Sequence, residues 1–312
     1  EIAATPASLK AALATTLGPT AITTTQKLVV SNTGGSDLNW TAEALTALPT
    51  MIVGASAEGP KDDPGVPGAL GNGGPDAFGY TWRDSDAPSG PAFDWVDISG
   101  IGTPITFSGD DQNQAGILIG FDFPFYGNTF TTVNACTNGW LSFTNTTTDF
   151  SNDPLPNSGA PENLLAAFLD DLTVSSLGDA YYYRDGTRFI VSYVAVPRLT
   201  SGGPYTFQVI LYPSGRIVYQ YLDMQGTRLN EATVGIQNAA RTDGLTIVHN
   251  ANYVHNNLAV EIATVPDYLT VTPTTGTIPA GGSADLDVTF NTTGLFGGLY
   301  NGSIRVSRTD PD

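Results

Sequence analysis

The sequence has few basic residues: three lysines and nine arginines stand against thirty acidic residues, which gives a formal net charge of -18. Nucleic acids and anionic membranes attract basic protein surfaces, so this shortage argues against both as partners. Cations fit the charge better. Simple colloidal repulsion between copies of the protein is the favoured explanation of the acidic charge.

Cysteine is nearly absent, because Cys136 stands alone and no intrachain disulfide can form. It lies in the strand-like run "TTVNACTNGWLSF", which predicts a small buried hydrophobic residue. No apolar run approaches the roughly 20 residues of a membrane span, so we expect no membrane insertion. The chain begins at Glu1 without a methionine, which is consistent with a processed secreted protein or a fragment.

Glutamate is also scarce, with 6 residues against 24 aspartates, while Gly (35) and Pro (21) are plentiful. Asp, Gly and Pro favour turns, whereas Glu is the acidic residue that helices prefer. The composition therefore predicts an all-β protein of many short strands.

The stretch "SNTGGSDLNW", residues 31–40, predicts the end of one strand, a Gly-Gly turn and the start of the next. The strands that would complete its sheet are found after Val265, as "YLTVTP", "SADLDVTF" and "LYNGSIRVS". The segments "TTGTIPAGG" and "NTTGLFGG" between them are typical of turns. Residues 5–17 fit a helix by leucine spacing, and a strand by the resemblance described next.

Residues 5–48 and 265–308 together resemble an Ig-like domain of the ASH/BACON type, through the "SNTGGSDLNW" turn and the "LTVTPTTGTIPAGGS" run. The resemblance implies one Ig-like sandwich split by an insertion, which surface loops tolerate when their ends are close together. We therefore expect four segments along the chain: residues 1–50, the first half of the Ig-like domain; 51–75, a linker or long loop; 76–262, the inserted β-sandwich; and 263–312, the second half.

The insertion shows two hairpins, "AYYYRDGTRFIVSYVAV" and "YTFQVILYPSGRIVYQYL", and its turn signals predict about ten strands. Residues 76–240 resemble a nidogen-like β-domain in "DFPFYGNTFTTVNACTNGWLSF" and "NLLAAFLDDL", although Leu169 stands where that family usually has Trp. Such domains occur beside catalytic domains of secreted bacterial peptidases and in bacterial surface proteins. That association implies a context and no chemistry of its own.

Catalytic patterns are sparse. His249 and His255 are six residues apart, which on one strand would give a possible metal pair, but Asn-rich turns separate them and favour a structural role. No nucleophile elbow, zinc-protease motif or phosphate loop is present. We expect no enzymatic activity.

Paired or closely spaced aspartates occur in three turn-rich segments. Carboxylates in loops suit calcium, which binds six to eight oxygens, but no EF-hand spacing is present and solvated turn aspartates fit the pattern as well. The candidate metal ligands are Asp84, Asp86, Asp110, Asp111, Asp170 and Asp171.

Two functions follow from these observations. The first is a non-enzymatic extracellular structural or adhesion protein that associates with itself or with other surface proteins. It could be a subunit of a surface filament or matrix that assembles through its terminal strands. The alternative is an accessory substrate- or glycan-binding module of a larger secreted hydrolase such as a peptidase. The many aromatic residues allow glycan stacking, but core packing explains most of them.

Overall fold

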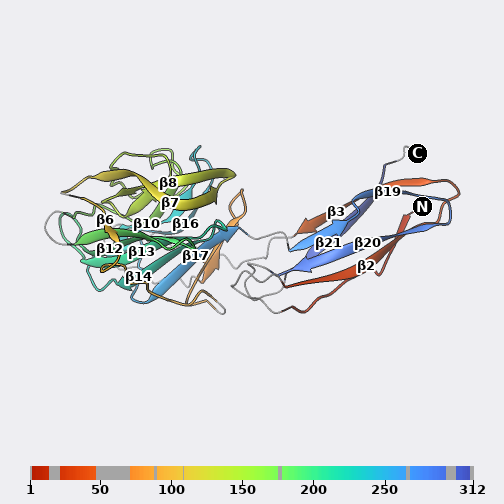
Figure 1. Ribbon diagram of the computed structural model, residues 1–312, viewed down its shortest axis with the longest axis horizontal. Coiled ribbons are helices and arrows are strands. Elements are labelled where there is room, and N and C mark those ends of the chain that lie inside the picture. Colours follow the sequence, from red (N-terminus) through yellow and green to blue (C-terminus); the bar gives the residue numbers. More distant parts are fainter. Residues whose placement is uncertain are drawn as a thin grey trace. The chain divides into compact units, whose positions relative to one another are not determined.

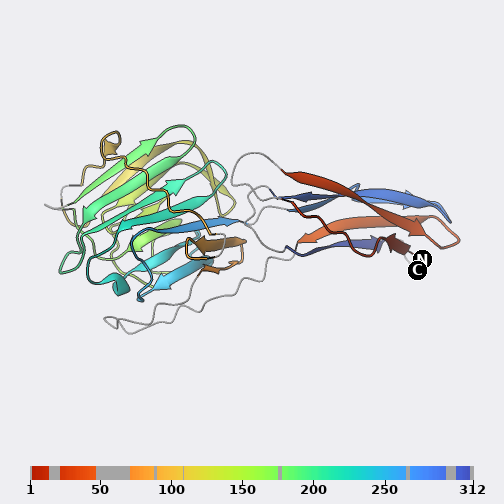
Figure 2. The same cartoon turned by 90° about the horizontal axis from the view of Figure 1, so that it is seen from below.

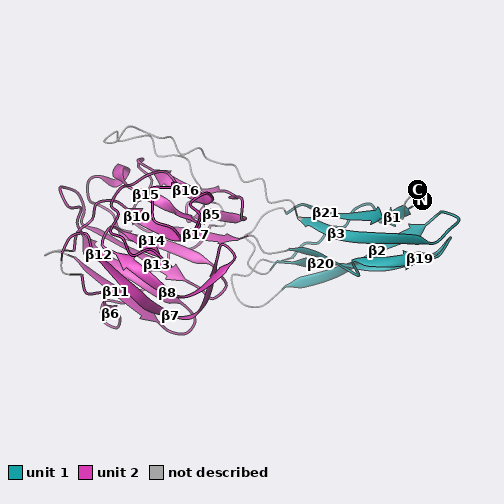
Figure 3. Ribbon diagram, turned by 90° about the horizontal axis from the view of Figure 1, so that it is seen from above, with its two compact units in different colours: residues 1–50, 265–312 teal, residues 51–264 magenta. Residues whose placement is uncertain are grey.

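A computed structural model describes residues 2–13, 22–46, 71–87, 90–107, 109–174, 178–264, 268–292 and 300–309. Within them the regular structure is β-strand apart from one short 3-10 helix, η1 (Leu229–Glu231), which confirms the predicted all-β class. The chain divides into two compact units, residues 1–50 with 265–312 and residues 51–264 (Figures 1 and 3).

Unit 1 is built from the two ends of the chain. One sheet has the strand order β1-β2-β20-β18 and the other β19-β3-β21. These strands are β1 (Ile2–Thr5), β2 (Thr23–Asn32), β3 (Leu38–Thr46), β18 (Leu269–Thr272), β19 (Thr275–Ile278), β20 (Ser283–Asn291) and β21 (Gly302–Arg308). Strand β2 pairs antiparallel with β20, and β3 pairs with β21. The expectation that the missing strands follow Val265 is confirmed.

The Gly-Gly turn connects two sheets instead of closing a hairpin. Strands β2 and β3 on either side of it belong to different sheets. The buried Asn32 explains the crossover, because its Nδ2 donates to the carbonyls of Ser36 at 2.7 Å and Ile278 at 3.0 Å. A side-chain amide thus ties the turn to β19, which the alternating pattern alone could not reveal.

Two further local predictions are wrong. Part of "TTGTIPAGG" forms β19, which pairs antiparallel with β3, and a Cβ on Gly276 would lie 2.9 Å from the Trp40 indole. The glycine makes room for a tryptophan there and marks no turn. Of residues 5–17, residues 6–13 form neither helix nor strand, and residues 14–17 lie outside the described residues.

Alternating residues of β2 and β20 build the core of unit 1. Leu286 and Val288 are buried beside Leu28, Val30 and the indole of Trp40, and Ala284 and Phe290 pack at the edge of the same cluster. These four residues of β20 share one face of the strand, as the apolar alternation in "SADLDVTF" predicts.

Unit 2 is a sandwich of an eight-stranded and a six-stranded sheet, in the orders β4-β5-β17-β14-β13-β12-β11-β6 and β16-β15-β10-β9-β8-β7 (Figures 1 and 2). The described residues thus include fourteen strands here, more than the ten expected, because several are only two or three residues long. The first seven are β4 (Asn72–Gly73), β5 (Tyr80–Asp84), β6 (Thr103–Pro104), β7 (Asn113–Phe125), β8 (Asn128–Cys136), β9 (Trp140–Ser142) and β10 (Leu164–Leu169). The other seven are β11 (Asp179–Arg184), β12 (Phe189–Val196), β13 (Tyr205–Leu211), β14 (Ile217–Asp223), β15 (Thr233–Gln237), β16 (Gly244–His249) and β17 (Leu258–Thr264).

Both predicted hairpins are confirmed, as β11–β12 and β13–β14. Tyr182 packs against the main core between the sheets, whereas Tyr181 and Tyr183 pack on the opposite face against a smaller cluster around Ile190. Most of the predicted linker, residues 51–70, lies outside the described residues, and Asn72–Gly73 pairs with β5.

The outer face of the six-stranded sheet is also covered. Cys136, Trp140, Leu164 and Leu169 pack there against Leu155, which comes from the connection between β9 and β10. Cys136 is fully buried, as its strand-like surroundings predict. Because β10 is buried on both faces, the residues directly after it are held firmly at the end of the sheet.

Candidate functional site

Three of the six predicted metal ligands converge at one end of the six-stranded sheet. Asp110 and Asp111 precede β7, and Asp171 follows β10. One carboxylate oxygen from each lies within 4.8 Å of the other two. Oxygens on opposite sides of a Ca²⁺ ion, each at about 2.4 Å, are about 4.8 Å apart, so one such ion could contact all three.

Asn138, which the sequence reading did not select, holds the two aspartate segments together. Its buried side chain donates from Nδ2 to Asp111 Oδ1 at 2.8 Å and to the Thr148 carbonyl at 3.1 Å. Its Oδ1 accepts from the Leu172 backbone N–H at 3.0 Å. One amide therefore links the loop before β7 to the loop after β10, and its signal in the sequence was the "TNGW" turn.

Gly139 makes this linkage possible. Its φ is +75°, and a Cβ at this position would lie 2.0 Å from the Phe168 carbonyl oxygen. Only glycine tolerates both the left-handed backbone and so close an approach of β10.

Asp170 has a different role from its neighbour. Its side chain is 1% exposed and accepts from Arg198 Nε at 2.7 Å and from the Asp171 backbone N–H at 2.8 Å. Arg198 also binds Glu231 at 3.1 Å. Asp170 thus belongs to a buried ion-pair network, while Asp171 faces the acidic cluster.

The acidic cluster carries uncompensated negative charge. Burial and the charge of Asp110 raise the pKa of the Asp171 carboxyl, although Arg198 opposes them. Burial and the charge of Asp111 likewise raise the pKa of Asp110. None of the three carboxylates takes part in an ion pair within 4.0 Å among the described residues.

Two buried oxygens beside the cluster have no hydrogen-bond partner among the described residues, Asp110 Oδ1 and Thr173 Oγ1. Thr173 is 6% exposed and forms an antiparallel bridge with Asp110, so both side chains lie on the same face. Buried oxygens without a donor are costly unless water or an ion satisfies them. An oxygen-only ligand set without His or Cys suits a hard cation such as calcium.

Asp84 and Asp86 are not part of this cluster. Asp84 is buried, and its carboxylate accepts from the Ala87 N–H at 3.0 Å and from the Tyr253 hydroxyl at 2.9 Å. The exposed Asp86 pairs with His255 Nε2 at 3.0 Å. Asp84 thus holds the turn after β5, and a carboxylate with these donors has little capacity left for a metal.

The two histidines lie in different surroundings. His249 Nδ1 is 3.0 Å from Thr233 Oγ1 at the end of β16, whereas His255 contacts Asp86. Among the described residues, neither histidine belongs to a group of three potential metal ligands. Burial raises the pKa of the Cys136 thiol to about 12, which leaves it almost entirely unionised at neutral pH.

Residues 87–280, more than half of the sequence, match the NIDO-related family. The chain belongs to this family. The match confirms the nidogen-like resemblance and indicates an extracellular type of module, and it continues past unit 2 into β18 and β19. It leaves out residues 1–86 and 281–312, and the resemblance of unit 1 to ASH/BACON-type domains stays a prediction. No solved structure matches the chain. No helix among the described residues has the length and apolar character needed to cross a membrane.

Proposed function

We propose that this chain is a non-enzymatic structural or adhesion module of an extracellular protein, and that calcium binds its acidic cluster. The observation that supports the calcium site is the convergence of Asp110, Asp111 and Asp171. Two buried oxygens at this place have no hydrogen-bond partner among the described residues. A bound cation would neutralise the repulsion between the carboxylates and give Asp110 Oδ1 a partner.

The contacts of the described histidines and cysteine support a role without catalysis. A nucleophile needs a base within hydrogen-bond reach and an open position for substrate. Cys136 is buried with an unionised thiol, and the contacts of His249 and His255 include a threonine, two asparagines and an aspartate.

Calcium would act as a clamp in this proposal. It would join the loop before β7 to the loop after β10, which the amide of Asn138 and the Asp110–Thr173 bridge already connect. A ligand that binds only the folded state at 100 times its Kd stabilises that state by about 2.7 kcal/mol. For a unit of this size we expect Tm to rise by about 5–10 °C in calcium.

Edge strands in unit 1 support self-association. Strands β1 and β21 each lie at the edge of a sheet, with one hydrogen-bonded neighbour among the described strands. Unpaired edges can accept a strand from another copy. Because β1 and β21 already pair within their own chain, assembly would add a copy to the edge and need not donate a free terminal strand.

The calcium experiment compares thermal unfolding in calcium and in chelator for the wild-type protein and for Asp171→Asn. We expect the variant to lose the calcium shift and to melt higher than wild type in chelator, because one repelling charge is gone. Asp122→Asn, an exposed charge change on β7, serves as the matched control and should keep the shift. An equal calcium shift in Asp171→Asn would contradict the assignment.

The assembly experiment is electron microscopy of the purified chain in calcium. Regular filaments or arrays that disappear when residues 1–10 are removed would support assembly through β1. Dispersed monomers would instead favour the accessory-module alternative.

A further inference from the structure

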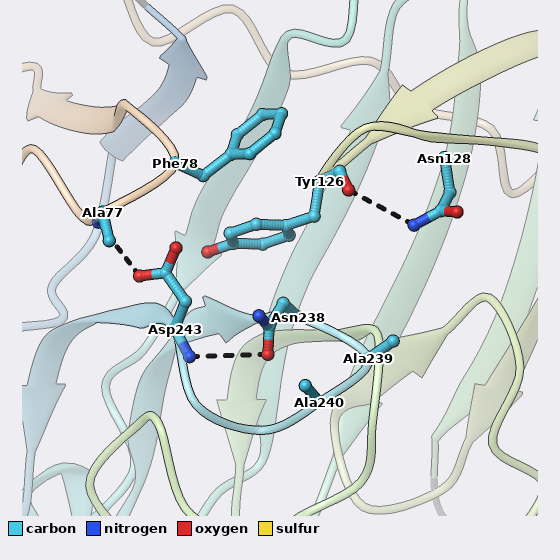
Figure 4. A pocket seen from close by; sticks show the side chains of 8 residues that line it. All are labelled: Ala77, Phe78, Tyr126, Asn128, Asn238, Ala239, Ala240 and Asp243. Atoms are coloured by element: carbon cyan, nitrogen blue, oxygen red, sulfur yellow. Dashed lines mark hydrogen bonds between the residues drawn. The ribbon is translucent and has the colours of Figure 1, made fainter.

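A pocket of about 320 Å³ opens at one end of unit 2, away from the residues assigned above. Three segments meet there: the turn before β5, the β7–β8 turn and the β15–β16 turn. The lining residues are Ala77, Phe78, Tyr126, Asn128, Asn238, Ala239, Ala240 and Asp243 (Figure 4). The pocket therefore draws on segments attached to both sheets.

One wall of the pocket is aromatic. Phe78 is 46% exposed, and its ring centroid lies 5.3 Å from that of Tyr126 and 5.6 Å from that of Tyr80. The Tyr126 hydroxyl donates to Asp76 Oδ2, and this hydrogen bond holds in place the ring that packs against Phe78. An exposed phenylalanine held on two tyrosines presents a rigid π-face to the pocket.

The polar side of the pocket is negative. Asp243 Oδ1 accepts from the Ala77 backbone N–H at 3.0 Å, and Oδ2 has no hydrogen-bond donor among the described residues. Figure 4 shows this carboxylate beside the ring of Tyr126. Burial chiefly, with a contribution from the charge of Asp243, raises the pKa of Asp76. No Lys or Arg lines the pocket in the described part of the chain, and neither aspartate forms an ion pair there.

The β15–β16 turn holds Asp243 in place. Asn238 Oδ1 accepts from the backbone N–H groups of Thr242 at 3.1 Å and Asp243 at 3.4 Å. On the other side, Asn128 Nδ2 donates to the Tyr126 carbonyl at 3.2 Å, which leaves its Oδ1 as a further acceptor. The pocket thus offers acceptors and π-faces held in fixed positions.

We propose that this pocket binds an organic cation, an ammonium or guanidinium group, between the Phe78–Tyr126 rings and the Asp243 carboxylate. A cation over an aromatic ring is attracted to its negative face, and a nearby carboxylate adds a charge-assisted hydrogen bond. An anion would meet only carboxylates and amides. This proposal goes beyond the structural function and uses none of its acidic cluster, so either can fail without the other.

The test is a titration of ¹⁵N-labelled full-length protein, followed by NMR, in buffer of constant calcium and ionic strength. The probes are tetramethylammonium, N-acetyl-lysine amide, N-acetyl-arginine amide and methyl β-glucoside. We expect the cations to shift the backbone amide signals of residues 77–79, 126–128 and 238–243, and the glucoside to leave them unchanged. Tighter binding of the amino-acid amides would identify a basic side chain of a partner as the source, and tighter binding of tetramethylammonium a free quaternary amine.

Two variants and two controls separate the contributions. Asp243→Asn keeps an oxygen for the Ala77 N–H but removes the charge, and should weaken cation binding about tenfold. Phe78→Ala should weaken it about three- to fivefold. Asp285→Asn, an exposed charge change in unit 1, and Phe150→Ala, another exposed aromatic residue, should leave it unchanged. Absence of shifts up to 50 mM cation, equal affinity in Asp243→Asn, or shifts with the glucoside alone would overturn the proposal.

Discussion

Replacing Arg198 by methionine should destabilise unit 2 strongly, because this arginine compensates two buried carboxylates. Its side chain is 10% exposed, whereas those of Asp170 and Glu231 are each 1% exposed. Methionine preserves most of the side-chain volume, so the change mainly removes the positive charge. Glu231 keeps a second partner in Arg228, but among the described residues Asp170 keeps the backbone N–H of Asp171 alone. Breaking one partner of a buried pair costs about 3–5 kcal/mol, and we expect about 4 kcal/mol.

Urea unfolding monitored by tryptophan fluorescence measures this loss, because three of the four tryptophans belong to unit 2. With a slope of about 2.5 kcal/mol per M, the midpoint should fall by roughly 1.5 M. The control is Arg188→Met, which removes an exposed pair with Asp185 and should cost less than about 0.5 kcal/mol. Similar midpoints for the two variants would refute the reasoning that burial sets the cost.

Three other experiments, one on thiol reactivity and two on substitutions, test the packing of unit 2. The Cys136 thiol, with its pKa raised to about 12 by burial, should resist an aromatic disulfide reagent at pH 8 in the native protein and react after unfolding in urea. Gly139→Ala should prevent unit 2 from folding or lower its Tm by more than 10 °C, because the added Cβ would lie 2.0 Å from the Phe168 carbonyl oxygen. The control is Gly186→Ala, which has a similar φ but no atom within 4 Å of the added Cβ, and it should cost about 1 kcal/mol. Asp84→Ala should cost about 3 kcal/mol in urea unfolding, since two backbone N–H groups and a tyrosine hydroxyl lose their acceptor.

Local pattern predicted most strands, since alternation and turn residues act over a few positions. The β11–β12 hairpin follows from the Asp185-Gly186 turn together with the apolar strands on either side of it, and the face of β20 follows from its period of two. What the pattern could not predict depends on distant contacts. The Gly-containing segment 275–278 forms β19 by pairing with β3, where Gly276 leaves room for Trp40, and the Asn32 amide ties the crossover between the sheets to Ile278.

The candidate sites show the same limit. Acidic composition selected Asp110, Asp111 and Asp171, but it could not separate them from Asp170, because only the fold places Arg198 beside one of two adjacent aspartates. No sequence pattern indicated the proposed cation pocket. Its lining comes from three separate turns, and in each turn an isolated aromatic or polar residue is unremarkable.

The short motifs that carry the family resemblance are explained by the fold more than by any chemistry. In "TNGW", Asn138 bonds both neighbouring loops, Gly139 lets β10 approach, and the Trp140 indole donates to the Asp149 carbonyl at 2.8 Å on the covered face of the sheet. In "LDDL", Asp170 neutralises a buried arginine. The contacts of these residues stabilise the sandwich itself and involve no ligand. A function particular to this chain is therefore to be sought at groups that the fold leaves unsatisfied, the carboxylates around Asp171 and the exposed ring and carboxylate of the pocket.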